Sequence, residues 1–167
     1  MTTLPQAVKE IAATEPLVED VVLDILRGAI PEILWADETE QSSPPPFGIV
    51  RRDSYVGVGD EDHRFIASAY CAVHTFTDGI SADIDNSRLQ EAVKLTMLRA
   101  GFAQPAARDW GFVSSIRLVE PYRKRSDLQN SEGPVQYADL PNDYTRYESV
   151  WEVKIRRAHL GPHFSTQ

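Results

Sequence analysis

The stretch FIASAYCAVHTFT, residues 65–77, decides the fold, because it combines apolar, aromatic and β-branched residues and contains no Asp, Glu, Lys or Arg. This composition predicts a β-strand. A strand that is apolar on both faces is expected in the middle of a sheet with cover on each side, or in a contact between subunits. Residues 47–50 (FGIV) predict a preceding strand, and residues 57–63 (GVGDEDH) supply the turn between the two strands.

The segment SADIDNSRLQEAVKLTMLRAGF, residues 81–102, predicts an amphipathic helix that is the main packing element on the sheet. Ser81 or Asp83 can cap its start, and Gly101 is expected to end it. Six residues share one side at helical spacing, and Leu89, Val93 and Met97 among them are expected to be buried. They are Leu89, Ala92, Val93, Thr96, Met97 and Ala100.

Another helix is predicted over residues 14–30 (TEPLVEDVVLDILRGAI), with Thr14 as N-cap and Pro16 in the first turn. An apolar stripe at helical spacing supports it, and Pro31 closes the pattern. The stripe consists of Leu17, Val21, Ile25 and Ala29. Beyond this helix, the three prolines at residues 44–46 favour polyproline geometry and predict an extended linker.

Two more strands are predicted, one over residues 111–120 (GFVSSIRLVE) and one over residues 145–158 (TRYESVWEVKIRRA). The second alternates well. One of its faces carries Tyr147, Trp151, Val153 and Ile155, and the other carries Glu148, Glu152, Lys154 and Arg156. The order of elements predicts an α+β fold, in which a mixed, mostly antiparallel sheet has two main helices packed on one face.

A long polar segment, residues 121–145, separates these last two strands. Loops longer than roughly 12–15 residues without structure of their own are usually functional or disordered. Tyr and Arg are enriched in buried contacts between proteins, so the segment is predicted to be an extended assembly loop. Its candidate subunit or partner interface residues are Tyr122, Arg123, Lys124, Arg125, Tyr137 and Tyr144. The alternative is a solvated loop that has no partner.

Length and charge limit the class of protein. The 167 residues fit a single domain, residues 1–167, with an ordinary content of 42% hydrophobic and 25% charged residues. The net charge of −8 argues against a free-standing nucleic-acid binder, which usually has a basic surface. No apolar run approaches the roughly 18 residues of a membrane span, and the first residues lack the pattern of a secretory signal. We therefore expect a soluble, unexported protein.

The sequence offers no constellation of catalytic residues. The GVGD of residues 57–60 lacks the remaining glycines and lysine of phosphate-binding loops, and the acidic residues 60–62 lack the alternate spacing of a calcium loop. Cys71 is the single cysteine and is expected to be a small buried hydrophobe, and His74 is expected to be packed or at an interface. We predict no enzymatic activity, no cofactor and no metal site.

Two segments carry a resemblance to a known family: VHTFTDGISADIDNSRLQEAVKLTMLRAGF, residues 73–102, and EPYRKRSDLQNSEGPVQYADLPNDYTRYESVWEVKIRR, residues 120–157. With the order of the elements, they resemble the tail terminator proteins of long-tailed bacterial viruses, over residues 47–157. Members of that family are small mixed α/β proteins without enzymatic activity. They form a six-membered ring that caps the tail tube, stops its growth and offers a docking surface to the head-side connector.

The resemblance implies a structural protein of the virion tail and neck, present in the host cytoplasm during assembly. Its implied partners are further copies of itself, the tail tube protein and the head–tail connector or stopper protein. DNA is expected to pass through the lumen without specific binding, because carboxylates repel its phosphates. The alternatives are another neck component, such as a head-closure, stopper or head–tail adaptor protein, and a small metal-dependent hydrolase. The proline-rich residues 43–46 have no counterpart known in the family.

Overall fold

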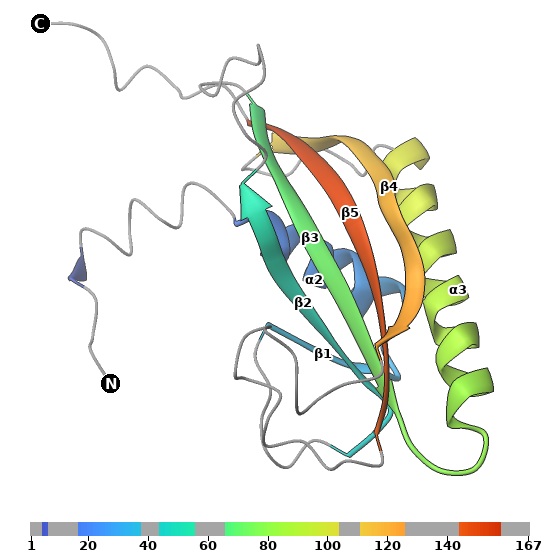
Figure 1. Cartoon of the computed structure of the whole chain (residues 1–167). Coiled ribbons are helices and arrows are strands. Elements are labelled where there is room, and N and C mark those ends of the chain that lie inside the picture. The colour runs from blue at the N-terminus through green and yellow to red at the C-terminus, as the bar shows by residue number, and fades with distance from the viewer. Residues whose placement is uncertain are drawn as a thin grey trace, which may run out of the picture.

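A computed structural model describes residues 5–6, 17–37, 44–55, 66–103, 111–125 and 144–157 (Figure 1). The helices named here are α2 (Val18–Ala29) and α3 (Ala82–Ala103). The strands are β1 (Leu34–Ala36), β2 (Phe47–Tyr55), β3 (Ile66–Thr77), β4 (Gly111–Arg125) and β5 (Thr145–Arg157). The predicted turn at residues 57–63 lies outside the described residues.

The strands form one five-stranded sheet in the order β1-β2-β3-β5-β4. The short β1 pairs with β2 in parallel, and the other neighbouring strands are antiparallel. The predicted α+β fold with a mixed, mostly antiparallel sheet is therefore confirmed. The apolar β3 lies in the middle of the sheet, as its sequence predicted, and pairs with β5 along its whole length.

Both helices pack on the same face of the sheet, which we call the helix-covered face (Figure 1). One core cluster joins them to the inward side chains of the strands. It includes Val22 and Leu26 of α2, Val93 and Met97 of α3, Cys71 and Val73 of β3, and Trp151, Val153 and Ile155 of β5. Burial of each large apolar side chain contributes about 1.5–3 kcal/mol to folding, so this cluster holds the two layers together.

The chain segment after α2 is fixed by Trp35. Its indole Nε1 donates to the carbonyl of Ile30 at 3.1 Å, and the guanidinium of Arg27 donates to the Trp35 carbonyl at 2.8 and 3.1 Å. The ring lies directly over Gly48 of β2, where an added Cβ would come within 2.1 Å of a ring carbon. Glycine is therefore required at this position, because any side chain would displace the indole.

Three predicted boundaries need correction. Helix α3 continues through Gly101 to Ala103, so Gly101 does not end it. The first helix begins at Val18, because Leu17 has an extended backbone and forms its N-cap without a side-chain hydrogen bond. Thr14 is therefore not the N-cap, and residues 14–16 lie outside the described part of the chain. In the strand predicted over residues 111–120, pairing with β5 extends β4 to Arg125, so residues 121–125 belong to a strand and not to the predicted loop. Residues 126–143 lie outside the described ranges.

The buried side of α3 also differs from the prediction. Val93 and Met97 are fully buried, as expected, but Leu89 is only partly buried. Two amides, Asn86 and Gln90, complete the buried stripe instead. No helix in the described ranges has the combined length and hydrophobicity needed to cross a membrane.

The prolines of residues 44–46 lie immediately before β2. The peptide bond between Pro45 and Pro46 is cis. The prolines predicted to form the extended linker are therefore described, whereas residues 38–43 before them lie outside the described ranges.

Candidate interface at one end of the sheet

One end of the sheet brings together segments that are far apart in the sequence. Thr77, at the end of β3, pairs with Thr145 at the start of β5, and Arg146 pairs with Arg125 at the end of β4. The first turn of α3 joins them, because the Thr77 hydroxyl donates to the carbonyl of Ala82 at 2.7 Å. We call this region the turn end of the sheet, since the β3–α3 turn closes it (Figure 1).

Five of the six candidate interface residues lie at this turn end, on β4 or just before β5. The ring of Tyr122 packs against Tyr147, with centroids 5.9 Å apart, and Tyr144 packs edge-on against Phe47 at 6.2 Å. Their placement shows that β4 and β5 gather these residues into one region. The sixth residue, Tyr137, lies outside the described residues.

The basic residues of this set contact acidic groups on three elements. Arg123 is paired with Glu120 of β4 at 2.8 Å, and both side chains are about half exposed. Lys124 reaches α3, where its ammonium lies 2.6 Å from a carboxylate oxygen of Asp83. The Lys124 pair links the edge strand to the start of α3, although exposed pairs of this kind contribute at most about 1 kcal/mol.

Arg125 belongs to a buried ionic cluster on the opposite face of the sheet, which neither α2 nor α3 covers and which we call the helix-free face. Its guanidinium donates to one carboxylate oxygen of Glu148, and Arg146 donates to the other at 2.9 Å. The same Nη2 of Arg146 lies 3.2 Å from Nδ1 of His74. The Glu148 carboxylate therefore ties β4 to β5, and Arg146 ties β5 to β3.

His74 is neutral in this cluster. Burial and the neighbouring Arg146 lower the pKa of its imidazole to about 3. Because Arg146 can only donate, Nδ1 must accept and the ring proton lies on Nε2. The 3.3 Å approach of Nδ1 to Glu148 is therefore a contact between two acceptors that share one Arg146 donor.

Glu148 remains ionised although it is buried. Burial acts to raise the pKa of this carboxyl, but the hydrogen bond from Arg125 and the charges around it outweigh burial, so the pKa is lowered. Two guanidinium groups thus compensate the desolvation of one carboxylate. An apolar cluster adjoins these charges on the same face, where Phe47 stacks on Phe76 with centroids 4.6 Å apart.

On the helix-covered face, a chain of hydrogen bonds runs from β5 to α3. Trp151 Nε1 donates to the Ser149 hydroxyl at 3.0 Å, and this hydroxyl donates to Gln90 Oε1 at 3.0 Å. The Gln90 amide nitrogen donates to the Thr75 hydroxyl at 2.9 Å, and Thr75 donates to Asn86. Each amide and hydroxyl thus has a partner in an otherwise apolar core.

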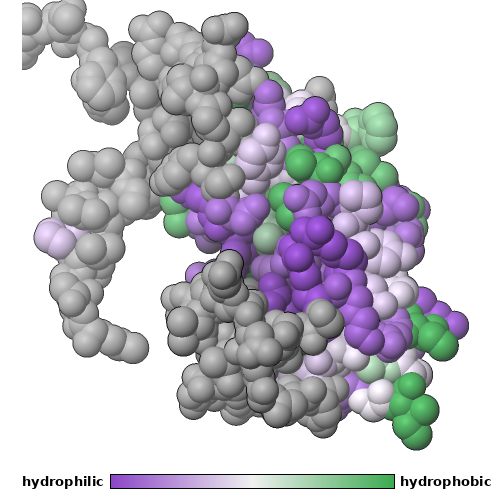
Figure 2. Space-filling model, in the orientation of Figure 1, coloured by the Kyte–Doolittle hydropathy of each residue, from purple (hydrophilic) through white to green (hydrophobic). Residues whose placement is uncertain are grey.

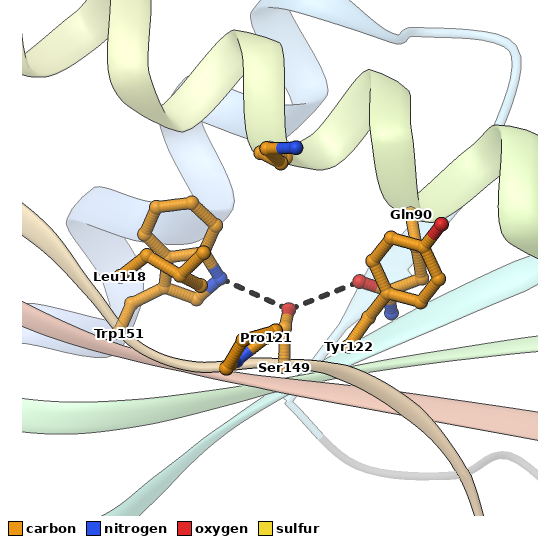
Figure 3. Close-up of a pocket in the computed structure, with 7 residues that line it drawn as sticks. Gln90, Leu118, Pro121, Tyr122, Ser149 and Trp151 are labelled. Atoms are coloured by element: carbon orange, nitrogen blue, oxygen red, sulfur yellow. Dashed lines mark hydrogen bonds between the residues drawn. The ribbon is translucent and has the colours of Figure 1, made fainter.

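A pocket of about 50 Å³ opens beside these hydrogen bonds, between α3 above and β4 and β5 below (Figure 3). We call it the α3–β4 pocket. Its walls are chiefly apolar, and Ser149 forms part of its floor. The residues that line it are Gln90, Lys94, Leu118, Pro121, Tyr122, Ser149 and Trp151. The candidate interface residue Tyr122 is therefore also a wall of this pocket.

Charge is unevenly distributed over the elements. Strands β4 and β5 carry mostly basic charged residues, namely Arg117, Arg123, Lys124, Arg125, Arg146, Lys154, Arg156 and Arg157, against Glu120, Glu148 and Glu152. In Figure 2, hydrophilic residues spread across the middle of the molecule. Since the whole chain has a net charge of −8, the β4–β5 pair is a basic region of an acidic protein.

Groups that could act in chemistry are few in the described part of the chain. No three His, Cys, Asp or Glu side chains there are arranged to hold a metal ion. Cys71 is buried, and burial raises the pKa of its thiol to about 12. The acidic residues 60–62 lie outside the described residues.

Comparison with models of known protein families finds no family that matches this chain, and no curated protein sequence matches it.

Proposed function

We propose that this protein is a structural virion protein, a tail terminator whose copies form a ring on the tail tube. In this role it ends polymerisation of the tube and docks the tail to the head-side connector, without enzymatic activity. The number of copies, six, comes from the resemblance of residues 47–157 to that family.

The observation that carries the proposal is the gathering of candidate interface residues at the turn end. Tyr122, Arg123, Lys124 and Arg125 follow one another on β4, an edge strand that pairs with β5 and with no other strand of the described chain. An unpaired strand edge is a ready surface for contact with another chain. Tyr and Arg are also the residues that dominate the energy of protein interfaces.

The buried ionic cluster supports the proposal in a second way. Arg125, Arg146 and Glu148 fix the end of β4 against β5, so the candidate residues are held on a paired strand. A surface that is ordered before binding loses less conformational entropy on association, which favours a repeated contact between identical subunits. A heterologous contact of this kind must close into a ring or grow into a filament.

The test is deletion of the gene from the viral genome that encodes the chain, followed by electron microscopy of the particles. We expect tail tubes of uncontrolled length that are not joined to heads, and normal particles when the gene is supplied in trans. An antibody to the protein should mark the head end of the tail. Tails of normal length in the deletion strain would overturn the proposal, and label on the head alone would favour a head-closure protein.

Native mass spectrometry of the purified protein gives an independent test of the ring. We expect a single closed oligomer, six-membered by resemblance, at concentrations at which assembly is complete. A ladder of open oligomers of increasing length would instead indicate a filament.

A further inference from the structure

The β3–α3 turn and the start of α3 form an acidic segment with two exposed isoleucines, which we call the acidic turn (residues 78–85). Ile80 is 111% exposed and is the most exposed large hydrophobic residue of the described chain, and Ile84 is 59% exposed. Asp78, Asp83 and Asp85 flank them. In Figure 2, apolar surface protrudes at the lower right, where this turn lies in Figure 1.

The acidic turn has a defined conformation. Gly79 adopts a φ of 83°, which favours glycine, and the amide of Ala82 donates to the Gly79 carbonyl at 3.2 Å. The Thr77 hydroxyl closes the turn through the Ala82 carbonyl. Ile80 is therefore displayed on an ordered turn, and a partner that covers it gains apolar burial with little loss of backbone entropy.

The α3–β4 pocket is suited to an apolar group of this size. Its volume of about 50 Å³ exceeds the roughly 10–15 Å³ that a single water needs. The polar atoms at its floor already bond one another, since Trp151 donates to Ser149 and Ser149 donates to Gln90. An aliphatic side chain can therefore fill the pocket without leaving a buried polar group unpaired.

Ile80 cannot enter the pocket of its own subunit. Gln90 and Lys94, which line the pocket, are about two and three turns along α3 from its start at Ala82, or about 12–18 Å at 1.5 Å per residue. The helix between them is continuous, so Ile80 stays apart from Gln90 and Lys94, although Lys124 at the end of β4 contacts Asp83 of the turn. If Ile80 fills such a pocket, the pocket must belong to another copy.

The net charges of the two regions are opposite in sign. The acidic turn carries three aspartates, of which Asp83 is paired with Lys124 of the same chain, and Lys94, which borders the pocket, is paired with Glu91. Strand β4, which forms the outer wall of the pocket, carries four basic residues against one glutamate. Opposite charges around an apolar centre steer two surfaces into register and disfavour contact between two like surfaces.

We infer that the acidic turn of one copy docks on the α3–β4 pocket of a second copy, with Ile80 inserted between Leu118, Pro121 and Trp151. This inference rests on the self-association in the proposed function and names the contact that makes it. The two surfaces are different parts of the same chain, so the contact is heterologous and repeats head to tail around a ring.

Site-specific cross-linking tests the contact directly. Ile80→Cys and Lys94→Cys place one thiol on each surface, and both positions are exposed enough to tolerate the change. We expect an oxidised mixture of the two variants to give at least tenfold more covalent dimer than either variant alone. The matched control is Asp24→Cys, at an exposed position of α2, mixed with Lys94→Cys. Equal yields in the control mixture, or dimers of Ile80→Cys with itself, would overturn the inference.

A charged substitution at Ile80 tests whether this side chain inserts into the α3–β4 pocket. Ile80→Asp should raise the protein concentration needed for half-assembly at least tenfold, whereas Ile80→Leu should change it less than threefold. Phe102→Asp is the matched control, because Phe102 is 87% exposed at the far end of α3. Circular dichroism should show that all three variants are folded.

The outcomes separate this inference from the proposed function. If Ile80→Asp assembles like the unaltered protein and rings still form on tails, the docking contact is wrong and the proposed function stands. If the unaltered protein does not associate at any concentration and the deletion strain has tails of normal length, both fail. Loss of assembly in Ile80→Asp without the Ile80–Lys94 cross-link would mean that another surface covers the turn, and would also overturn the inference.

Discussion

The two faces of β5 are buried to a similar degree but are chemically opposite. On the helix-covered face, Trp151 and Val153 are fully buried in an apolar core. On the helix-free face, Glu148 and Glu152 are 8% and 7% exposed, and Glu148 lies among arginines. Burial alone therefore does not identify the core, since the second face depends on paired charges that hold strands together.

The two faces of β5 should respond differently to mutation. Removal of an apolar side chain should cost transfer and cavity energy, whereas removal of one charge should leave its partners buried without compensation.

The largest effect is expected on the helix-covered face. Trp151→Ala should lower the free energy of unfolding by about 3–5 kcal/mol, because it empties a core site and removes the donor to Ser149. Denaturation with urea measures this change. Trp151→Phe keeps most of the apolar volume and should cost clearly less, and similar losses in both variants would show that the cavity is not the main cost.

On the helix-free face, substitution of Glu148 should lower the free energy of unfolding nearly as much. Glu148→Gln should cost about 2–3 kcal/mol, below the 3–5 kcal/mol typical of a buried pair, because the Arg125 side chain is 37% exposed. Glu120→Gln is the matched control, since the Glu120–Arg123 pair is about half exposed and should contribute less than about 1 kcal/mol. Equal effects of the two changes would contradict the view that the cluster is structural.

The pH dependence of stability reports on His74. Its folded-state pKa of about 3 lies below the unfolded value near 6.5, so the unfolded state takes up the proton first as the pH falls. The free energy of unfolding should therefore decrease by about 1.4 kcal/mol between pH 7.5 and 5.5 on account of this residue.

His74→Asn is the control for that measurement, because the Asn oxygen can accept from Arg146 and does not titrate. The decrease should shrink by about 1.4 kcal/mol in this variant. An unchanged pH profile would indicate that another group dominates the titration.

The smallest effect is expected at the margin of the core. Leu89→Ala should cost about 1 kcal/mol, since the side chain is only partly buried against the cluster and a full Leu→Ala cost is about 2–5 kcal/mol. Val93→Ala, at a fully buried site of the same helix, should lower the melting temperature more. The reverse order would show that the buried side of α3 is wrongly assigned.

Sequence alone predicted those elements whose side-chain pattern matches the environment that they occupy in the fold. The uniformly apolar β3 could be predicted as the central strand, and the alternation in β5 identified Trp151, Val153 and Ile155 as inward residues. The strand, turn and strand predicted over residues 47–77 agree with the antiparallel pairing of β2 and β3.

The remaining features depend on pairing that no local pattern reveals. Pro121 and the run of basic residues to Arg125 disfavour a strand, but the ladder with β5 supplies their backbone partners, and register shifts around Glu120 accommodate the proline. From the sequence alone, Glu148 is expected to be solvated, because one of its two arginine partners, Arg125, comes from another strand. From the sequence alone, Asn86 and Gln90 are expected on the surface of the helix. No local pattern shows that their hydrogen-bond partners, Thr75 and Ser149, lie opposite them on strands.

The hydrogen-bond chain from Trp151 to Asn86 has a mechanical consequence. A helix held only by apolar contacts can slide or rotate on a sheet with little change in contact energy, but a slip of one residue in α3 would turn Gln90 and Asn86 away from their partners by about 100°. Each amide also donates to a strand carbonyl, Gln90 to Val73 and Asn86 to Thr145. A load applied at the start of α3 is therefore transmitted to β3 and β5 as a rigid displacement.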